Sequence, residues 1–401
     1  MEKIRAVLSP EKLQKWIYWA MLLLGASSCV SEALAHNMIR LALLFGGIYM
    51  VLYPSVLRDI SKYKMFAYTM AAFAAMFYVS AVYGGDFFVA VHHESISYNY
   101  QMLGAFLACL FIFDKKKLIY IIYSMFVSLF LVNAELLYQY IQVGGRPAST
   151  IGHPVGWTAF LYVILLPALF VYLLNEKTRK RKLWGWLLAI MSLEALFATG
   201  ARGAWIAVFI VGSMLIVYYV RDWKKLLAAI GVAAIFVGGS IYATPSLQAR
   251  IATIGDSTEH SQAQRYLFWR SATQMFLDHP IMGVGAVNYP ALYQTKYISP
   301  LADEPNVAHA HNNFFHFLAE EGIIGMSLYS IMIGYCLWWS WKRHKDMFGM
   351  LLFASTLTLV IFSLTDYTWP MFTPMRIYWV LLGICIRGVE LSEQKFIKTT
   401  V

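Results

Sequence analysis

The chain has 401 residues, of which 59% are hydrophobic, 16% aromatic and only 13% charged, and its formal net charge is +10 at pH 7. The mean hydropathy is +0.57. These values lie outside the usual range of soluble domains, so the composition argues against a soluble protein and predicts one that resides in a membrane.

Apolar runs of about 18 to 22 residues recur along nearly the whole chain, and this is the length that roughly 30 Å of hydrocarbon requires of a helix. We therefore predict an all-α polytopic membrane protein with about twelve transmembrane helices. In chain order they cover residues 16–35, 39–57, 65–84, 97–113, 118–138, 156–174, 183–199, 203–220, 226–243, 314–341, 348–365 and 375–388. The first run is followed almost at once by the second, which indicates a helical hairpin and not a removable signal peptide.

The predicted spans divide the chain into three regions. Residues 1–243 carry helices one to nine, residues 244–313 form one large loop with an amphipathic helix, and residues 314–401 carry helices ten to twelve and the C-terminus. Of the 32 Lys and Arg residues only eight fall on the side of the large loop. The positive-inside rule makes the opposite face, with both termini, cytoplasmic. The net charge thus reflects topology, and nucleic-acid binding is the poorer explanation because the basic clusters lack a binding motif.

The four cysteines, at positions 29, 109, 336 and 385, all lie within predicted spans. They show no paired spacing and have no histidine close by in the sequence. A disulfide or zinc framework is therefore not expected.

Seven of the eight basic residues predicted on the outer face are arginines. Because arginine presents a planar fork of donors and never loses its charge, this bias suggests an anionic ligand. The alternative is snorkelling or contact with lipid phosphates, which suits Arg40 and Arg146. The eight residues are Arg40, Arg146, Arg202, Arg250, Arg265, Arg270, Lys296 and Arg376.

Arg202 lies in the sequence FATGARGAW, in a short turn between two predicted spans. Its guanidinium is expected at the membrane surface, beside Gly200 and Gly203, which would let a ligand approach the backbone. An anchor on lipid headgroups is the alternative.

The large loop contains the sequence SQAQRYLFWRSATQMFLDHPIMGVGAVNYPALY, which begins with a helical pattern and turns at Asp278-His279-Pro280. We expect this helix to lie along the membrane interface with its aromatic face down and with Arg265 near headgroup level. GVGAVN has no strand before it and no helix start after it, so it is interpreted as a turn and not as a dinucleotide-binding loop. The expected aromatic face consists of Tyr266, Trp269, Thr273 and Phe276.

Residues 309–325 read HAHNNFFHFLAEEGIIG, and they place His311 at the level of headgroups and sugars. A neutral imidazole there is suited to act as a general base on a hydroxyl, although a helix cap or a headgroup contact is the simpler role. His309 and His316 are less suited, because the first precedes the expected helix start and the second lies among phenylalanines. A metal site of His309 and His311 is not expected, since two such positions on a helix point in different directions.

One spacing resembles the signature of bacterial O-antigen ligases: His311-Asn312 is followed after nine residues by Gly322, and Gly325 follows after two more. The segment RYLFW...DHPIMGVGAVNY is similar to the loop of the wider ligase and polymerase superfamily. The resemblance also covers the topology, with about twelve spans and one large periplasmic loop late in the chain.

This resemblance implies a GT-C-like glycosyltransferase in which two arginines bind the donor diphosphate and a histidine is the base. The matching positions are Arg202, Arg265 and His311. The implied donor is a polysaccharide on undecaprenyl diphosphate, and the implied acceptor is a sugar hydroxyl of lipid A-core. The implied reaction is inverting, needs no metal or other cofactor, and takes place at the periplasmic face of the inner membrane.

Secondary candidates for the site are Asn312, Arg270, Arg376 and Asp366. The residue that orients His311 stays open at this point, with three carboxylates as candidates: Asp366, Asp303 and Glu304.

Three other functions stay open. An O-antigen polymerase uses the same donor, and an oligosaccharyltransferase acts on protein hydroxyls. A flippase or transporter of polyprenyl-linked glycans should carry charges deep in its spans, whereas these spans are almost free of them and Glu135 and Glu194 are the deepest acids.

Overall fold

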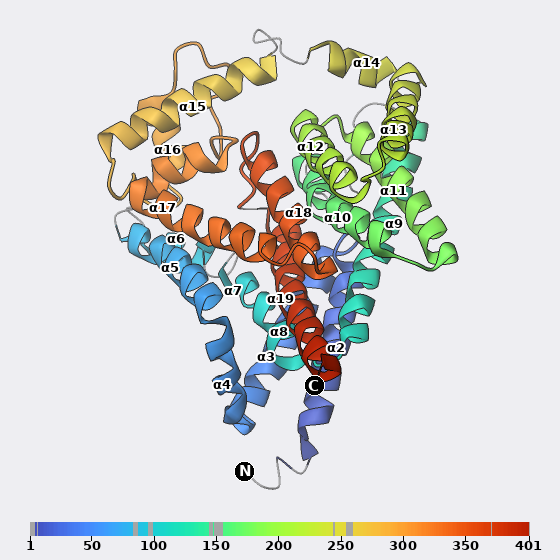
Figure 1. Cartoon of the computed structure of the whole chain (residues 1–401). Helices are drawn as coiled ribbons and strands as arrows, with labels where there is room; N and C mark the ends of the chain where they lie inside the picture. Colours follow the sequence, from blue (N-terminus) through green and yellow to red (C-terminus); the bar gives the residue numbers. More distant parts are fainter. Residues whose placement is uncertain are drawn as a thin grey trace.

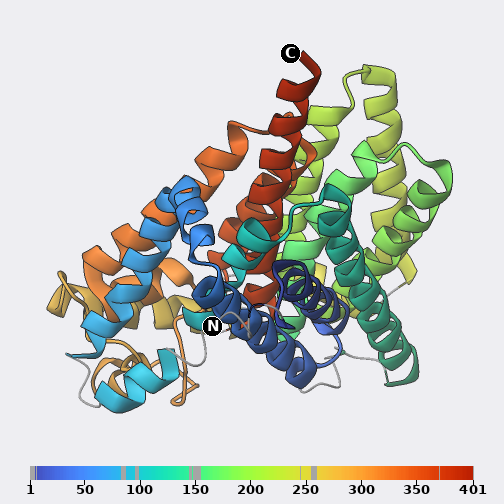
Figure 2. The same cartoon turned by 90° about the horizontal axis from the view of Figure 1, so that it is seen from below.

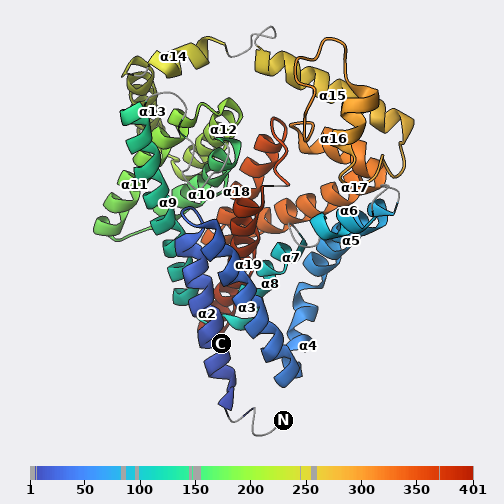
Figure 3. The same ribbon diagram turned by 180° about the vertical axis from the view of Figure 1, so that it is seen from behind.

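The computed structural model describes residues 5, 7–82, 87–94, 99–143, 147, 155–243, 245–253, 260–369 and 371–400. Every regular element in these ranges is a helix, which confirms the all-α class. Both termini lie at one end of the molecule, and helices α14 (Pro245–Ala252) and α15 (His260–Asp278) lie at the other (Figures 1 and 3).

Eight helices in the described ranges are long and apolar enough to cross a membrane, so the chain is a polytopic membrane protein. The other four predicted spans fall on α2, α5, the pair α7–α8, and α18, which are shorter or less apolar. The eight are α3 (Glu32–Leu52), α9 (Lys115–Val143), α10 (Val155–Asn175), α11 (Arg179–Thr199), α12 (Arg202–Tyr219), α13 (Trp223–Ala243), α17 (Asn313–Trp341) and α19 (Phe372–Thr400). The other four comprise α2 (Pro10–Ser27), α5 (Lys64–Ala81), α7 (Tyr100–Met102) with α8 (Gly104–Phe111), and α18 (Met347–Ser363).

The predicted boundary between the first two spans is wrong. Helix α2 ends at Ser27 and α3 begins at Glu32, so the run assigned to 16–35 crosses a turn. The side chain of Ser31 caps α3 by accepting a hydrogen bond from the amide of Leu34. Arg40 therefore lies two turns inside α3 instead of at its start. The last helix also continues to Thr400, well past the predicted end at 388.

Helices α10 and α19 form the centre of the bundle. In their apolar windows 83% and 94% of residues are buried, against 6% in α13, so α13 presents nearly its whole surface to the surroundings. Seen from below, α19 runs between α9–α13 on one side and α5 and α17 on the other (Figure 2).

The outer elements α15, α16 (Tyr289–Leu292) and the turn Tyr293–Tyr297 share a small core of their own. The predicted extent of α15 is confirmed, and its orientation on the membrane interface stays a prediction. Trp269 stacks on Phe315 at 5.3 Å, whereas Tyr266 is 68% exposed. The buried face is instead formed by Phe268, Ala272 and Met275.

Helix α17 is broken at Gly322, where φ is 63° and ψ is −163°. A loop from the end of α15 fits into the break. The amide of Ile323 donates to the carbonyl of Pro280 at 2.9 Å, and the amide of Val284 donates to the carbonyl of Ala319 at 2.8 Å. Backbone groups that lose their helical partners at the break are thus satisfied by the loop.

Two glycines permit this close approach. A Cβ on Gly322 would lie 2.4 Å from the carbonyl oxygen of Ile281, and a Cβ on Gly283 would lie 2.3 Å from that of Glu320. Both glycines have positive φ, which other L-residues rarely adopt. The segment 280–288 is a series of turns and bends, which confirms GVGAVN as a turn, although the expectation that no helix starts after it is wrong because α16 begins at Tyr289.

Candidate functional site

His311 lies in the turn that precedes α17, and its backbone has φ of +50°. A non-glycine residue in this region costs free energy, so the surrounding contacts must hold it there. Asn312 supplies one of them, because its Oδ1 caps α17 by accepting from the amides of Phe314 and Phe315 at 2.8 and 3.2 Å. The cap therefore fixes the backbone of His311 relative to the start of α17.

The same turn holds the connection between α18 and α19, residues 364–371. Asn312 Nδ2 donates to the carbonyl of Leu364 at 2.8 Å. The side chain of Asn313 both accepts from the amide of Thr368 at 2.7 Å and donates to its hydroxyl at 2.8 Å. The connection lies between α12 and the α15–α17 side of the molecule (Figures 1 and 3). These bonds place Asp366 beside His311.

Asp366 Oδ1 lies 3.1 Å from His311 Nδ1. Burial raises the pKa of the Asp366 carboxyl, but the hydrogen bond with His311 and the charges of His311, His309 and Arg265 together bring the pKa below its usual value. The ionised carboxylate accepts a hydrogen bond from Nδ1–H, which leaves Nε2 as the nitrogen with a free lone pair. The His311 side chain is 32% exposed, so it can meet a substrate.

Helix α15 brings the two candidate arginines toward this pair. Ser261, Arg265 and Phe268 share one face of the helix, because they are spaced by three or four residues. Arg202 Nη2 donates to Ser261 Oγ at 2.9 Å, Arg265 acts electrostatically on Asp366, and Phe268 stacks on His311 with ring centroids 5.9 Å apart. The structure thus gathers Arg202, Arg265, His311 and Asp366 around one face of α15.

The glycines beside Arg202 have a different role from the one expected. Gly200 takes φ of 66° and ends α11 in the left-handed conformation. A Cβ on Gly203 would lie 2.0 Å from Thr365 Oγ1, so this glycine lets α12 pack against the connection that carries Asp366. The expectation that a ligand approaches the backbone is therefore wrong for Gly203, whereas for Gly200 it stays a prediction.

His309 and His311 do not have the helical geometry that was expected of them. His309 and His311 lie in a turn and not on a helix, and their ring centroids are only 4.3 Å apart. Among the described residues, His309, His311 and Asp366 offer ligand atoms within 4.8 Å of one another. Burial lowers the pKa of His309 to about 3, so this ring is neutral at physiological pH. His316 instead pairs with Glu320 at 3.2 Å within α17.

The remaining candidates make other contacts. Arg270 is exposed on α15, Asp303 accepts from the side chain of Gln264, and the carbonyl of Glu304 accepts from the Tyr293 hydroxyl. Arg376 is buried on α19 against His36 of α3. Arg146 and the side chain of Arg250 lie outside the described residues.

Three residues that shape the site were not predicted from the sequence: Asn313, Phe268 and Glu320. Glu320 accepts from the amides of Val287 and Tyr289 at 3.1 and 2.7 Å, and so fixes the loop that enters the break in α17. The pair Asn312-Asn313 was the available signal. An asparagine before an apolar run suggests a helix cap, and only one of the two can be the cap, so the second can bond elsewhere. The sequence held no local signal for Phe268 or Glu320.

Residues 186–330 match the family model described as O-antigen ligase. The matched segment contains Arg202, Arg265 and His311, and it ends before Asp366. The search of curated proteins finds no match.

Proposed function

We propose, on the premise that the chain is a member of the O-antigen ligase and polymerase superfamily, that it transfers a glycan from a polyprenyl diphosphate to a sugar hydroxyl of an acceptor lipid. The observation that carries the proposal is the convergence of His311, Asp366, Arg202 and Arg265 around α15, at the end of the molecule away from both termini. We assign the donor to undecaprenyl diphosphate and the acceptor to lipid A-core, as the sequence resemblance implies.

In the proposed reaction His311 Nε2 removes the proton of the acceptor hydroxyl. The hydroxyl oxygen forms a bond to the anomeric carbon of the donor while the bond from that carbon to the diphosphate oxygen breaks, and the diphosphate leaves with the electron pair. A single displacement of this kind inverts the anomeric configuration. Asp366 holds the imidazole in the required tautomer and stabilises the imidazolium that forms.

The two arginines are suited to the departing diphosphate. Arg202 donates to the hydroxyl and carbonyl of Thr253 at 2.7 and 3.2 Å as well as to Ser261. Hydroxyl and carbonyl oxygens such as these are neutral, and the charged oxygens of a diphosphate bind a guanidinium more strongly. Negative charge grows on the diphosphate as the bond breaks, so fixed guanidinium groups lower the barrier to transfer.

The site lies at the level where both substrates present their reacting groups. We place it at the periplasmic face of the bacterial inner membrane, with both termini in the cytoplasm and with residues 244–313 as the periplasmic loop. This placement rests on the asymmetry of basic residues. A polymerase would use the same four residues on the same donor, with a second polyprenyl-linked glycan as acceptor.

The experiment uses the purified full chain in proteoliposomes, with a polyprenyl-diphosphate glycan and lipid A-core. We expect His311→Ala to insert normally and to lower transfer by about 10²-fold or more, because base removal leaves only positioning. His279→Ala is the matched control, since this histidine is exposed just after the end of α15. Near-normal transfer by His311→Ala overturns the general-base assignment, and use of only the second polyprenyl-linked glycan as acceptor identifies a polymerase.

The metal-independent step is tested in the same assay with EDTA. His311 cannot serve as a base if its ring is occupied by a cation shared with His309 and Asp366. Loss of transfer in EDTA, restored by one added divalent cation, would replace the general-base mechanism with a metal-assisted one.

A further inference from the structure

A second group of cationic side chains lies near the outer ends of α3 and α19, apart from the site around His311. Arg376 is 1% exposed, and its Nη2 lies 3.3 Å from His36 Nδ1. Because arginine can only donate, His36 Nδ1 accepts this hydrogen bond and the ring is neutral. The Tyr100 hydroxyl lies 3.1 Å from the same ring, and Arg40 lies over the Tyr100 ring at 6.0 Å.

The charges in this group do not balance. Arg376 and Arg40 contribute two positive charges, and Glu32 is the carboxylate that acts on Arg376 among the described residues. Nε and Nη1 of Arg376 are buried and have no hydrogen-bond partner within the described part of the chain. A buried guanidinium with unmet donors is costly, so an acceptor with negative charge would stabilise it.

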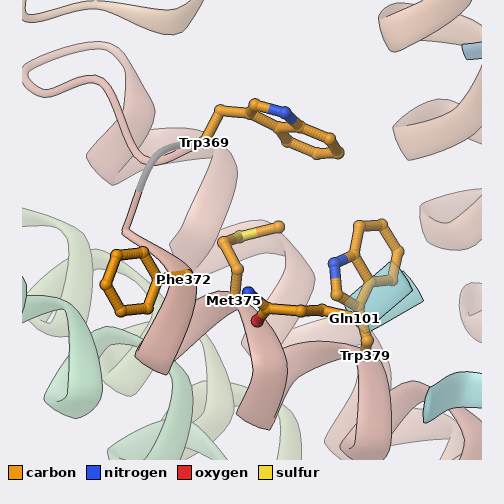
Figure 4. A pocket seen from close by; sticks show the side chains of 5 residues that line it. All are labelled: Gln101, Trp369, Phe372, Met375 and Trp379. Carbon is orange, nitrogen blue, oxygen red and sulfur yellow. The ribbon is translucent and has the colours of Figure 1, made fainter. Parts of the chain in front are cut away.

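The surroundings of Arg376 on its own helix are apolar. Its neighbours along α19, Phe372, Met375 and Trp379, line a small pocket together with Gln101 and Trp369 (Figure 4). Apolar walls keep the local dielectric low and strengthen the attraction of Arg376 for an anion.

The position of the group limits what the anion can be. Arg376 is in the second turn of α19, and Glu32, His36 and Arg40 occupy the first turns of α3, so all lie within about 12 Å of the helix ends along the axes. This is the depth of lipid headgroups and not of the hydrocarbon centre. Arg40 is exposed and offers the side from which a headgroup can approach.

We propose that Arg376 and Arg40 form a second anion site, which binds the phosphate of a lipid headgroup in the same leaflet as the reaction. The acceptor glycolipid and bulk phospholipid carry the same phosphate chemistry. The site is separate from the one around α15, and it stands whether or not the chain transfers glycans.

The test measures lipid retention on the purified full chain by native mass spectrometry, with three probes. These are diphosphoryl lipid A, phosphatidylglycerol, and a diacylglycerol without phosphate. We expect the phosphate lipids to be retained and the diacylglycerol to be lost. Arg40→Gln and Arg376→Gln should each weaken retention roughly tenfold or more, because each removes a charge-assisted donor.

Lys296→Gln is the control, because it removes one positive charge from an exposed side chain of the outer elements that pairs with Asp278. If Arg376→Gln fails to fold, Arg376→Lys replaces it: the charge is kept but the planar donors are lost, so retention of phosphate lipids should still fall. Arg40→Gln tests the exposed member of the same site. Equal retention in all variants, or an equal loss in Lys296→Gln, overturns the proposal. Retention of lipid A alone identifies the acceptor as the source, and retention of both phosphate lipids identifies a general headgroup site.

Discussion

Replacing Asp366 with Asn tests whether this carboxylate positions the base. The change keeps the shape of the side chain and the contact with His311 Nδ1 at 3.1 Å, but it removes the negative charge. A hydrogen bond to a charged group contributes about 1.5 to 3 kcal/mol, against about 0.5 to 1.5 for a neutral one. The difference, together with the lost stabilisation of the imidazolium, predicts a fall in kcat of roughly 10 to 100-fold. KM for the donor should change little, because Asp366 does not touch the diphosphate in the proposed arrangement.

The assay is transfer in proteoliposomes with separate titrations of donor and acceptor. Asp303→Asn is the matched control, since Asp303 is an exposed carboxylate that accepts from Gln264. The double variant His311→Gln with Asp366→Asn should be no slower than His311→Gln alone, because the two groups act as a unit. The reasoning is refuted if Asp366→Asn retains wild-type kcat, or if the two losses simply multiply.

Three further predictions follow from the geometry. Arg202→Lys and Arg265→Lys keep the charge but lose the planar fork, so each should lower transfer roughly tenfold or more, and wild-type rates would mark these residues as membrane anchors. Gly322→Ala should lower the thermal unfolding midpoint, because its Cβ would lie 2.4 Å from a loop carbonyl at positive φ, whereas Gly334→Ala in the same helix meets nothing within 4 Å and should leave the midpoint unchanged or raised. Burial lowers the pKa of His309 to about 3, so between about pH 6.5 and pH 3 the His309 imidazole binds a proton in the unfolded chain but not in the folded chain. Stability should therefore fall as the pH is lowered from 6.5 toward 3, and an equally steep fall in His309→Gln would contradict this origin.

The positions of the helices followed from the sequence where apolar runs end at charges or glycines. The turn before Arg202 is an example, because Gly200 ends α11 as the pattern indicates. The hairpin of α2 and α3 followed as well, but the position of its turn did not, since the apolar run continues through residues 28–31. Length and hydropathy detect a span, but they do not detect a break made of small and apolar residues.

The site followed from the sequence only in part. Arg202, Arg265 and His311 could be chosen because each stands in a short segment with its own pattern. The choice of Asp366 among three carboxylates depended on a contact across 55 residues of sequence, which no local pattern records. The geometry of His309 was misjudged for a related reason, because the backbone conformation before a helix cap is fixed by contacts with a distant loop.

The exchange of backbone hydrogen bonds between the 280–287 loop and the break in α17 has a consequence for biogenesis. Synthesis proceeds from the N-terminus, so α5 and the loop leave the ribosome before Gly322 does. Ser80 of α5 accepts from the amide of Ala286 at 2.8 Å, so a partly formed receptor for α17 can exist before that helix is complete. Docking of the newly inserted α17 onto this preformed segment is then the last step, and in a chain stalled before Gly322 the segment should be cleaved by an added protease that does not reach it in the complete chain.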